Sequence, residues 1–346
     1  MQTHAAIRWL WSATTTPARL ARASLVPAAA TYAACARARA RAYRHGLLRR
    51  TGVEVPTIAV GNLSVGGTGK TPVASWVAAL CARRGLVPGI VLRGYADEAQ
   101  VHRERVPAAI VVEGRDRPRA ARHAVRLGAR AIVLDDGFQR LDLRRDLNLL
   151  LISAEECDAA RWTLPAGPWR EPWSAIRRAD IVVVTRKRRT AEDAGRVARR
   201  IARSGVPPER IALVHLGLAS LTTLQDNGPV DLTSLRGARV LAVSGVANPD
   251  SFASQLARLG ALVRPVTYPD HHRYGQREVA SLLSAAAAVD YVVMTHKDAV
   301  KLRRLWTASR PTPLVAHLEV AWEQGADFVA DQITDLLTRH YTPGMY

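Results

Sequence analysis

A glycine-rich segment that follows a short β-branched run constrains the fold of this chain more than any other feature. The run at residues 57–60 leads into Gly61-Asn62-Leu63-Ser64-Val65-Gly66-Gly67-Thr68-Gly69-Lys70-Thr71-Pro72. A strand, a glycine-rich turn ending in Gly-Lys-Thr, and a helix start in this order are typical of a phosphate-binding loop. Ser64 replaces the first glycine of the usual G-x-x-x-x-G-K-[ST] pattern, and Pro72 suits the first helical turn. We therefore expect a phosphate-binding loop rather than an ordinary glycine-rich turn.

The residues of this loop have separate expected roles. Backbone N–H groups converge on phosphate oxygens, Lys70 neutralises the charge of the β- and γ-phosphates, and the Thr71 hydroxyl holds Mg²⁺. The helix that starts there adds the positive end of its dipole. The expected nucleotide-binding residues are Ser64, Val65, Gly66, Gly67, Thr68, Gly69, Lys70 and Thr71.

An apolar run at residues 132–134 ends in Asp135-Asp136-Gly137, which has the form of a Walker B element. In a sheet that contains a phosphate-binding loop, such a carboxylate lies beside the loop and holds Mg²⁺ directly or through water. Without that loop, a strand ending in Asp-Asp-Gly is a common turn. The combination predicts a magnesium site made by Thr71, Asp135 and Asp136.

The order of apolar runs and helical patterns predicts an α/β architecture. Short apolar runs alternate with helical segments, as expected for a doubly wound, mostly parallel sheet that is covered on both faces. In the first half of the chain the expected strands are residues 57–60, 89–92, 131–134, 147–152 and 181–185. Because the first of them precedes the phosphate-binding loop, we expect a fold of the P-loop NTPase type.

The chain of 346 residues is long enough for two domains. Residues 211–235 have few charges and short β-like runs, and we interpret them as a connection. A second series of strands and helices follows and predicts a second, smaller α/β domain. The expected division is an N-terminal region at residues 1–52, a P-loop domain at 53–210, the linker at 211–235 and the smaller domain at 236–346.

The net charge of +19 is weak support for a nucleic-acid partner. Only four of the 49 basic residues are lysine, so the charge reflects a general preference for arginine. The sequence also lacks the alternation of aromatic and basic residues that builds a base-stacking platform. We therefore expect no nucleic-acid partner.

The N-terminal segment is basic and apolar at the same time. Residues 1–53 contain no Asp or Glu, and their nine arginines are Arg8, Arg19, Arg22, Arg37, Arg39, Arg41, Arg44, Arg49 and Arg50. The apolar stretch at residues 23–36 is too short to span a bilayer and contains Pro27. Arginines interleaved with tryptophan and leucine suit the surface of an anionic membrane. The alternative is a solvated helix that packs on the domain.

The cysteine content favours a reducing compartment. Cys35, Cys81 and Cys157 are far apart and follow no disulfide or metal-binding spacing. A cytosolic location is the simplest interpretation.

Two polar motifs follow strands of the expected second domain. Tyr268-Pro269-Asp270-His271-His272 ends one strand, at the edge where α/β proteins bind ligands. A single histidine that handles a proton or orients a substrate is expected there, and a plain surface turn is the alternative. Thr295-His296-Lys297-Asp298-Ala299-Val300-Lys301 begins a helix after another strand, and its lysines either bind phosphate or solvate that helix.

Taken together, these motifs resemble the tetraacyldisaccharide 4'-kinase family, the lipid A 4'-kinases, from about Tyr43 to Leu302. The matching pieces are the Gly61-to-Pro72 loop, Tyr43-Arg44-His45-Gly46, Arg93-Gly94-Tyr95, Asp135-Asp136-Gly137-Phe138-Gln139, Leu164-Pro165-Ala166-Gly167-Pro168 with Arg170-Glu171, Pro269-Asp270-His271-His272, and Lys297-Asp298-Ala299-Val300-Lys301. Each motif is moderately specific, and the ordered set is highly specific.

The resemblance implies transfer of the ATP γ-phosphoryl group, with Mg²⁺, to the 4'-hydroxyl of a lipid-linked glucosamine disaccharide. It implies that this reaction takes place at the cytoplasmic face of the inner membrane, with the basic N-terminal helix as the membrane-associating element. It also implies that the linker is a β-ribbon. In this interpretation Lys70 is catalytic, because it cradles the transferred phosphate.

The family places a Gly-Asp-Glu-Pro motif before the third helix. The resemblance implies that the aspartate of this motif acts together with the first histidine of the Asp-His-His motif to accept the proton of the sugar hydroxyl. Alignment on the proline of Gly114-Arg115-Asp116-Arg117-Pro118 predicts a catalytic pair of Asp116 and His271. Arg117 then stands where the family has glutamate. Two further departures are Ala96-Asp97 in place of the glycines of Arg-Gly-Tyr-Gly-Gly, and His296 in place of the glutamate of Thr-Glu-Lys-Asp.

Two other functions remain as alternatives. A P-loop ATPase of the cofactor-synthesis or metal-insertion type often carries another lysine near the start of the loop, where this chain has Ser64 and Val65. A basic ATPase that binds nucleic acid, or a membrane-tethered scaffold, is the alternative from a different class.

Overall fold

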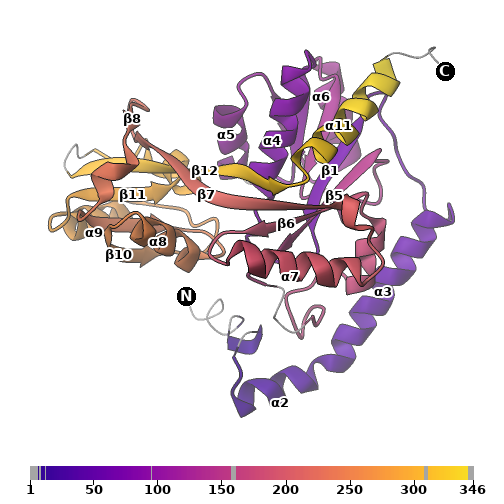
Figure 1. Cartoon of the computed structure of the whole chain (residues 1–346), viewed down its shortest axis with the longest axis horizontal. Helices are drawn as coiled ribbons and strands as arrows, with labels where there is room; N and C mark the ends of the chain where they lie inside the picture. Colours follow the sequence, from indigo (N-terminus) through magenta and orange to yellow (C-terminus); the bar gives the residue numbers. More distant parts are fainter. Residues whose placement is uncertain are drawn as a thin grey trace.

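The computed structural model describes residue 7 and residues 9–11, 13–94, 96–156, 161–307 and 311–341. Tyr95 of the expected Arg-Gly-Tyr motif and Cys157 lie outside these ranges. Two lobes share one continuous sheet, which Figure 1 shows edge to edge. Within the described residues its strand order is β10-β9-β11-β12-β7-β6-β5-β1-β4-β2-β3, with β8 paired to β7. The predicted α/β, P-loop NTPase-like fold with a smaller second α/β unit is confirmed.

The first lobe is a parallel sheet whose strands are apolar because both faces are covered. Its strands are β3 (Ile110–Glu113), β2 (Pro88–Leu92), β4 (Ala131–Asp135), β1 (Thr57–Asn62), β5 (Leu147–Ser153) and β6 (Ile181–Arg186). One face packs against α4 (Lys70–Arg83) and α11 (Ala326–Tyr341). The other packs against α6 (Arg117–Arg126) and α7 (Ala191–Ala202).

The second lobe continues the sheet with β12 (Thr312–Gln324), β11 (Tyr291–Thr295), β9 (Arg239–Ser244) and β10 (Leu262–Thr267). These strands pair in parallel. Helices α9 (Gln276–Ala286) and α10 (His296–Leu302) share an apolar cluster on one face. Helix α8 (Pro249–Arg258) packs in a separate cluster with other side chains of β9, β11 and β12.

A two-stranded antiparallel ribbon of β7 (Ile211–Thr223) and β12 joins the lobes. The expected linker at residues 211–235 contains β7 and the short β8 (Pro229–Val230), but its long partner strand comes from the C-terminal part of the chain. After β12 the chain returns to the first lobe, where Val329, Ile333 and Leu337 of α11 join the core of β1 and α4. Residues 326–341 therefore pack with the first lobe, although the sequence-based division grouped them with the second.

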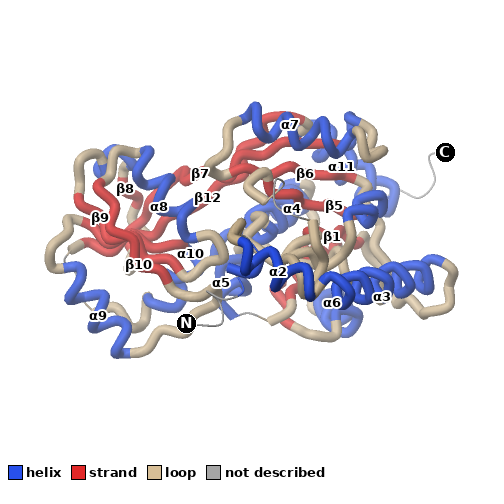
Figure 2. Tube along the Cα trace, turned by 90° about the horizontal axis from the view of Figure 1, so that it is seen from below, coloured by secondary structure: helices blue, strands red, loops and turns tan. Residues whose placement is uncertain are grey.

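Helices α2 (Thr16–Ser24) and α3 (Val26–Arg44) form an arm along the first lobe. In Figure 2 this arm lies in front of the lobe. The Thr163 hydroxyl donates to the Ala29 carbonyl at 2.8 Å, and Arg39 donates to the Gln139 carbonyl at 3.3 Å. Thr163 and Gln139 lie in loops after β5 and β4, at the carboxyl edge of the sheet. Among the described residues, no helix is long and apolar enough to cross a membrane.

Helix α5 (Ala96–Arg105) was not expected from the sequence. Its residues are mostly polar, so the sequence lacks the apolar stripe that would predict a helix here. It nevertheless buries Asp97, Ala99, Val101 and His102 between α4, β3 and the second lobe. This buried polar face brings α5 into the site.

Candidate functional site

The phosphate-binding loop and the acidic pair lie side by side because their strands are neighbours. Val60 of β1 is in register with Asp135 of β4, and the loop begins directly after β1. The carboxyl ends of parallel strands meet at one edge of a sheet, where α/β proteins bind ligands. As a result the Thr71 hydroxyl donates to Oδ2 of Asp135 at 3.2 Å. The structure thus brings together these two residues, as predicted.

Several backbone N–H groups of the loop are available to a ligand. Gly69 adopts a φ of +89°, a left-handed conformation that favours glycine, and α4 starts at the next residue. Among the described residues, the N–H groups of Gly66, Gly67, Gly69 and Lys70 donate to no backbone carbonyl. Together with the amino end of α4, these N–H groups form the expected anion-binding cradle.

Lys70 and Asp136 belong to a small polar cluster beside the loop. The Lys70 ammonium lies 3.3 Å from Oδ1 of Asn62 and 3.8 Å from Oδ1 of Asp136. Arg170, from the Arg170-Glu171 piece of the family motifs, donates to both Asp136 oxygens at 2.7 and 2.8 Å and also contacts Asn62. Burial acts to raise the pKa of Asp136, but the hydrogen bonds from Arg170 and the charge of Lys70 hold it well below its usual value. Asp136 is therefore an ionised anchor for two cations.

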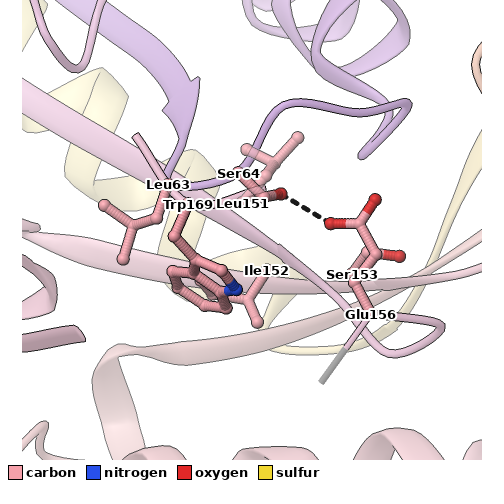
Figure 3. Close-up of a pocket in the computed structure, with 7 residues that line it drawn as sticks. All are labelled: Leu63, Ser64, Leu151, Ile152, Ser153, Glu156 and Trp169. Carbon is pink, nitrogen blue, oxygen red and sulfur yellow. Dashed lines mark hydrogen bonds between the residues drawn. The ribbon is translucent and has the colours of Figure 1, made fainter. Parts of the chain in front are cut away.

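Three side chains that sequence reasoning missed support the loop. Oε2 of Glu156 accepts a 2.5 Å hydrogen bond from Ser64, in the small pocket that Figure 3 shows. The Lys187 ammonium donates to the Gly67 carbonyl at 2.5 Å, and the Thr185 hydroxyl to the Thr68 carbonyl at 2.9 Å. All three follow or end β5 and β6, so a local motif search does not connect them with the loop. Burial raises the pKa of Glu156 above its usual value, although the Ser64 hydrogen bond and the charge of Lys187 act in the opposite direction.

Asp135 is nearly inaccessible, with 2% of its surface exposed. Its Oδ2 atom accepts from Thr71 and from Nε2 of His102, at 3.2 and 3.0 Å. Its Oδ1 atom is buried and has no hydrogen-bond partner among the residues that the structure describes. Burial acts to raise the pKa of Asp135, but the His102 hydrogen bond and the charge of Lys70 lower it overall.

These residues fit Mg²⁺. An ionised carboxylate with one orphaned oxygen, next to a threonine hydroxyl, supplies the oxygen ligands that the ion prefers. Within the described residues no group of three His, Cys, Asp or Glu side chains forms a metal cluster. Mg²⁺ in nucleotide sites needs only one or two carboxylates, because phosphate oxygens and waters complete its shell.

His271 pairs with Asp97, and not with the predicted Asp116. Nδ1 of His271 lies 3.1 Å from both Asp97 oxygens, and the Lys301 ammonium lies 3.4 Å from Oδ2 of Asp97. Burial acts to raise the pKa of Asp97, but the hydrogen bond and charge of His271 and the charge of Lys301 lower it to about 2. Asp97 is therefore a carboxylate at neutral pH, held between the two lobes.

Asp116 has a different place and task. It is exposed and forms the N-cap of α6, where Oδ1 accepts the N–H of Arg119 at 2.9 Å. The alignment on Pro118 selected a helix cap, because Asp and Pro are also the usual residues of a helix start. The signal for Asp97 was present in Ala96-Asp97-Glu98-Ala99, which keeps the Asp-Glu pair of the family motif but not its glycine and proline.

Helix α5 connects the lobes through further contacts of its acidic side chains. The Lys297 ammonium of α10 lies 2.5 Å from Oε1 of Glu98. Nε2 of His296 and NH1 of Arg303 lie 2.8 and 2.9 Å from the two oxygens of Glu104. The Lys297 and Lys301 side chains thus hold the two lobes together. The sequence had left two other roles open for these lysines, phosphate binding and solvation of the helix.

Comparisons with known proteins agree with this arrangement. The family model described as Tetraacyldisaccharide-1-P 4'-kinase matches residues 21–109 and 97–338. Tetraacyldisaccharide 4'-kinase of Geobacter sulfurreducens is 39% identical over 82% of this chain and 85% of its own length. The protein of the same name from Anaeromyxobacter sp. strain K is 37% identical over 89% of each chain.

A solved structure shares the whole architecture. The LpxK structure of Aquifex aeolicus in complex with ATP has a TM-score of 0.71 and 26% sequence identity. The match covers 91% of this chain and 99% of that one. The family match, the relatives and the shared two-lobed fold lead to one conclusion. The chain belongs to the tetraacyldisaccharide 4'-kinase family.

Proposed function

We propose that this chain transfers the γ-phosphoryl group of ATP to the 4'-hydroxyl of tetraacyldisaccharide 1-phosphate, the lipid A disaccharide precursor. The observation that carries the proposal is the Thr71–Asp135 contact at the phosphate-binding loop, which lies in the same lobe as the Asp97 carboxylate. Membership of the kinase family supplies the acceptor class.

Phosphoryl transfer requires alignment of the reactants and neutralisation of charge more than covalent catalysis. The free N–H groups of the loop and the Lys70 ammonium hold the β- and γ-phosphates. Lys70 leaves Asn62 and Asp136 for the phosphates, while Arg170 keeps Asp136 neutralised. Thr71 and Asp135 would hold Mg²⁺, which would supply further positive charge next to the phosphate oxygens.

Asp97 is the base in this proposal, in place of Asp116. A carboxylate with a low pKa accepts the hydroxyl proton as the new P–O bond forms, when the proton has become acidic. His271 orients Asp97 from the other lobe, and Lys301 balances its charge. Because the pair already joins both lobes in this structure, the closed arrangement of the lobes places the base for a sugar bound between them.

The N-terminal arm is proposed to hold the enzyme on the cytoplasmic face of the inner membrane. Trp9, Leu20 and Tyr32 are exposed at 44%, 67% and 38%. They lie on a segment that contains nine arginines and no acidic residue. Apolar side chains that enter the interface and arginines that attract anionic lipids are the usual components of such a binding surface.

The test is a transfer assay with γ-³²P-labelled ATP and a detergent-solubilised lipid A disaccharide acceptor. We expect label in the glycolipid and ADP release that depends on the acceptor. Parallel reactions contain duplex or single-stranded DNA. Release that DNA stimulates, without labelled lipid, would instead identify a nucleic-acid-dependent ATPase.

A further inference from the structure

A buried row of four polar side chains connects three elements behind the phosphate-binding loop. It runs from Thr71 through Asp135 and His102 to Ser75. Nε2 of His102 lies 3.0 Å from Oδ2 of Asp135, and Nδ1 lies 2.9 Å from the Ser75 hydroxyl. None of the His102 surface is exposed, although histidine is seldom fully buried. The nucleotide-binding residues described above account for Thr71 and Asp135 but not for His102.

The ionised carboxylate of Asp135 fixes the direction of its hydrogen bond with His102. An ionised carboxylate only accepts hydrogen bonds, so Nε2 of His102 carries a hydrogen and donates to Asp135. Nδ1 shares a hydrogen bond with the hydroxyl of Ser75, which lies one turn after Thr71 on α4. Both nitrogens of the ring are therefore engaged, and the ring plane is set by two different elements.

We infer that His102 is a positioning residue for the metal-binding carboxylate of Asp135. This inference rests on the proposed role of Asp135 in holding Mg²⁺. Two donors, Thr71 and His102, occupy Oδ2, so the unpartnered Oδ1 is the atom held ready for the ion. Partners that orient a metal ligand in this way typically contribute about 10- to 100-fold in metal affinity.

The position of His102 on α5 gives the contact a second consequence. The proposed base, Asp97, lies five residues earlier on the same helix. The His102–Asp135 and His102–Ser75 hydrogen bonds therefore anchor the helix that carries the base to β4 and to α4. The buried His102 side chain thus fixes the position of the base, Asp97, relative to the metal-binding carboxylate, Asp135.

The experiment compares two amide substitutions that differ only in reach. In His102→Gln the side-chain NH₂ reaches the position of Nε2 and donates to Asp135. In His102→Asn the amide reaches only the position of Nδ1, toward Ser75. Val101→Ala is the matched control, because Val101 is buried on the same helix and Val101 makes no side-chain hydrogen bond.

Mn²⁺ is the probe, titrated into each full-length variant with a non-hydrolysable ATP analogue and followed by the EPR signal of free Mn²⁺. We expect His102→Asn to weaken Mn²⁺ binding about 10-fold or more, and His102→Gln to stay within about 3-fold of the unmodified protein. Val101→Ala leaves Mn²⁺ binding unchanged. Binding of the analogue in EDTA is the same in all variants, because the loop itself is intact.

Asp135→Asn separates the metal site at Asp135 from the positioning role of His102. Asp135→Asn weakens Mn²⁺ binding if the carboxylate holds the ion. If His102→Asn and His102→Gln then bind Mn²⁺ with the same affinity as each other, the role of His102 is overturned and the proposed function stands. If Asp135→Asn itself leaves Mn²⁺ binding unchanged, both the metal site and the inference are overturned. A variant that melts before the titration temperature is measured at a lower temperature beside Val101→Ala.

Discussion

Nδ1 of His271 lies 3.1 Å from both carboxylate oxygens of Asp97, so that the second lobe contacts the proposed base of the first. His271 itself adopts a φ of +58°, which is uncommon for a residue other than glycine. Strained backbone is tolerated where the surrounding structure holds a side chain in a required place. The geometry therefore agrees with a histidine that is positioned for Asp97.

Asp97→Asn is expected to lower kcat by about 10²- to 10⁴-fold, because the amide cannot accept the hydroxyl proton. The KM for ATP changes little, since the loop and Lys70 are untouched. Steady-state kinetics with varied ATP and acceptor measures both parameters. A variant that retains full kcat would remove Asp97 from the mechanism.

Asp116→Ala tests the other aspartate that was considered as the base. Because Asp116 caps α6, its loss is expected to lower the free energy of unfolding by about 0.5–2 kcal/mol. Transfer activity should remain within about 2-fold, since Asp116 is exposed and bonds to its own helix. Denaturant unfolding and the transfer assay together check this outcome. Loss of kcat without loss of stability would restore Asp116 as the base.

Lys70→Ala is expected to reduce transfer by at least about 100-fold, because one charge-neutralising group on the transferring phosphate is lost. Arg83→Ala, an exposed cation at the other end of α4, serves as control and keeps its activity. Single-turnover transfer from labelled ATP measures the difference. Equal loss in both variants would point to damage of the helix rather than to phosphate binding.

The lobe contact should depend on pH through His271 and Asp97. Burial acts to lower the pKa of His271, but the Asp97 hydrogen bond and the charge of Asp270 raise it above its usual value. Its stabilising contribution is complete below the unfolded pKa of about 6.5 and is lost as pH rises through the folded value. The contribution of Asp97 is complete above about pH 4 and is lost as pH falls toward its folded pKa of about 2.

The stability difference between the unmodified protein and His271→Asn should therefore be largest between about pH 4 and 6.5. Above that range it should shrink. Other charges near His271 are Glu98, Asp270, Lys297 and Lys301, which both proteins share. Thermal unfolding at a series of pH values measures the difference. A difference that is constant from pH 5 to pH 9 would contradict the assigned contact.

The arm should bind anionic membranes. Replacing Leu20 and Tyr32 by Glu is expected to reduce binding to vesicles that contain an anionic lipid, because it removes apolar anchors and adds repulsion. Leu262→Glu is compared with Leu20→Glu alone as the control for one added negative charge, since Leu262 is 63% exposed on β10 of the other lobe and Leu20 is 67% exposed. Vesicle sedimentation at low and high salt measures both. Equal binding of the two variants would rule out the arm as the contact surface.

Local patterns were sufficient to predict the fold class and the neighbourhood of Thr71 and Asp135. A phosphate-binding loop and an acidic strand end are each continuous in the sequence, and parallel pairing places them at one edge. The pairing of β7 with β12 and the return of α11 to the first lobe depend on contacts between residues that are about 90 or more positions apart along the chain, which no local pattern encodes.

The choice between Asp97 and Asp116 shows a different limit. Both aspartates begin helices, and Asp116 had the proline that the family motif led us to expect. The burial of Asp97 and its contact with His271 follow from the way α5 meets the second lobe. His102, Glu156 and Lys187 were missed for the same reason, since each acts on a loop or carboxylate that is remote in the sequence.

The measurement that tests the central claim most directly is the position of the new phosphate in the reaction product. Purified protein, ATP and the disaccharide 1-phosphate acceptor are incubated, and the glycolipid is analysed by mass spectrometry and by ³¹P–¹H correlation NMR. We expect one added phosphate monoester, coupled to the proton at the 4' carbon, which is absent with Lys70→Ala. An unchanged glycolipid, or a phosphate at any other carbon, would contradict the account.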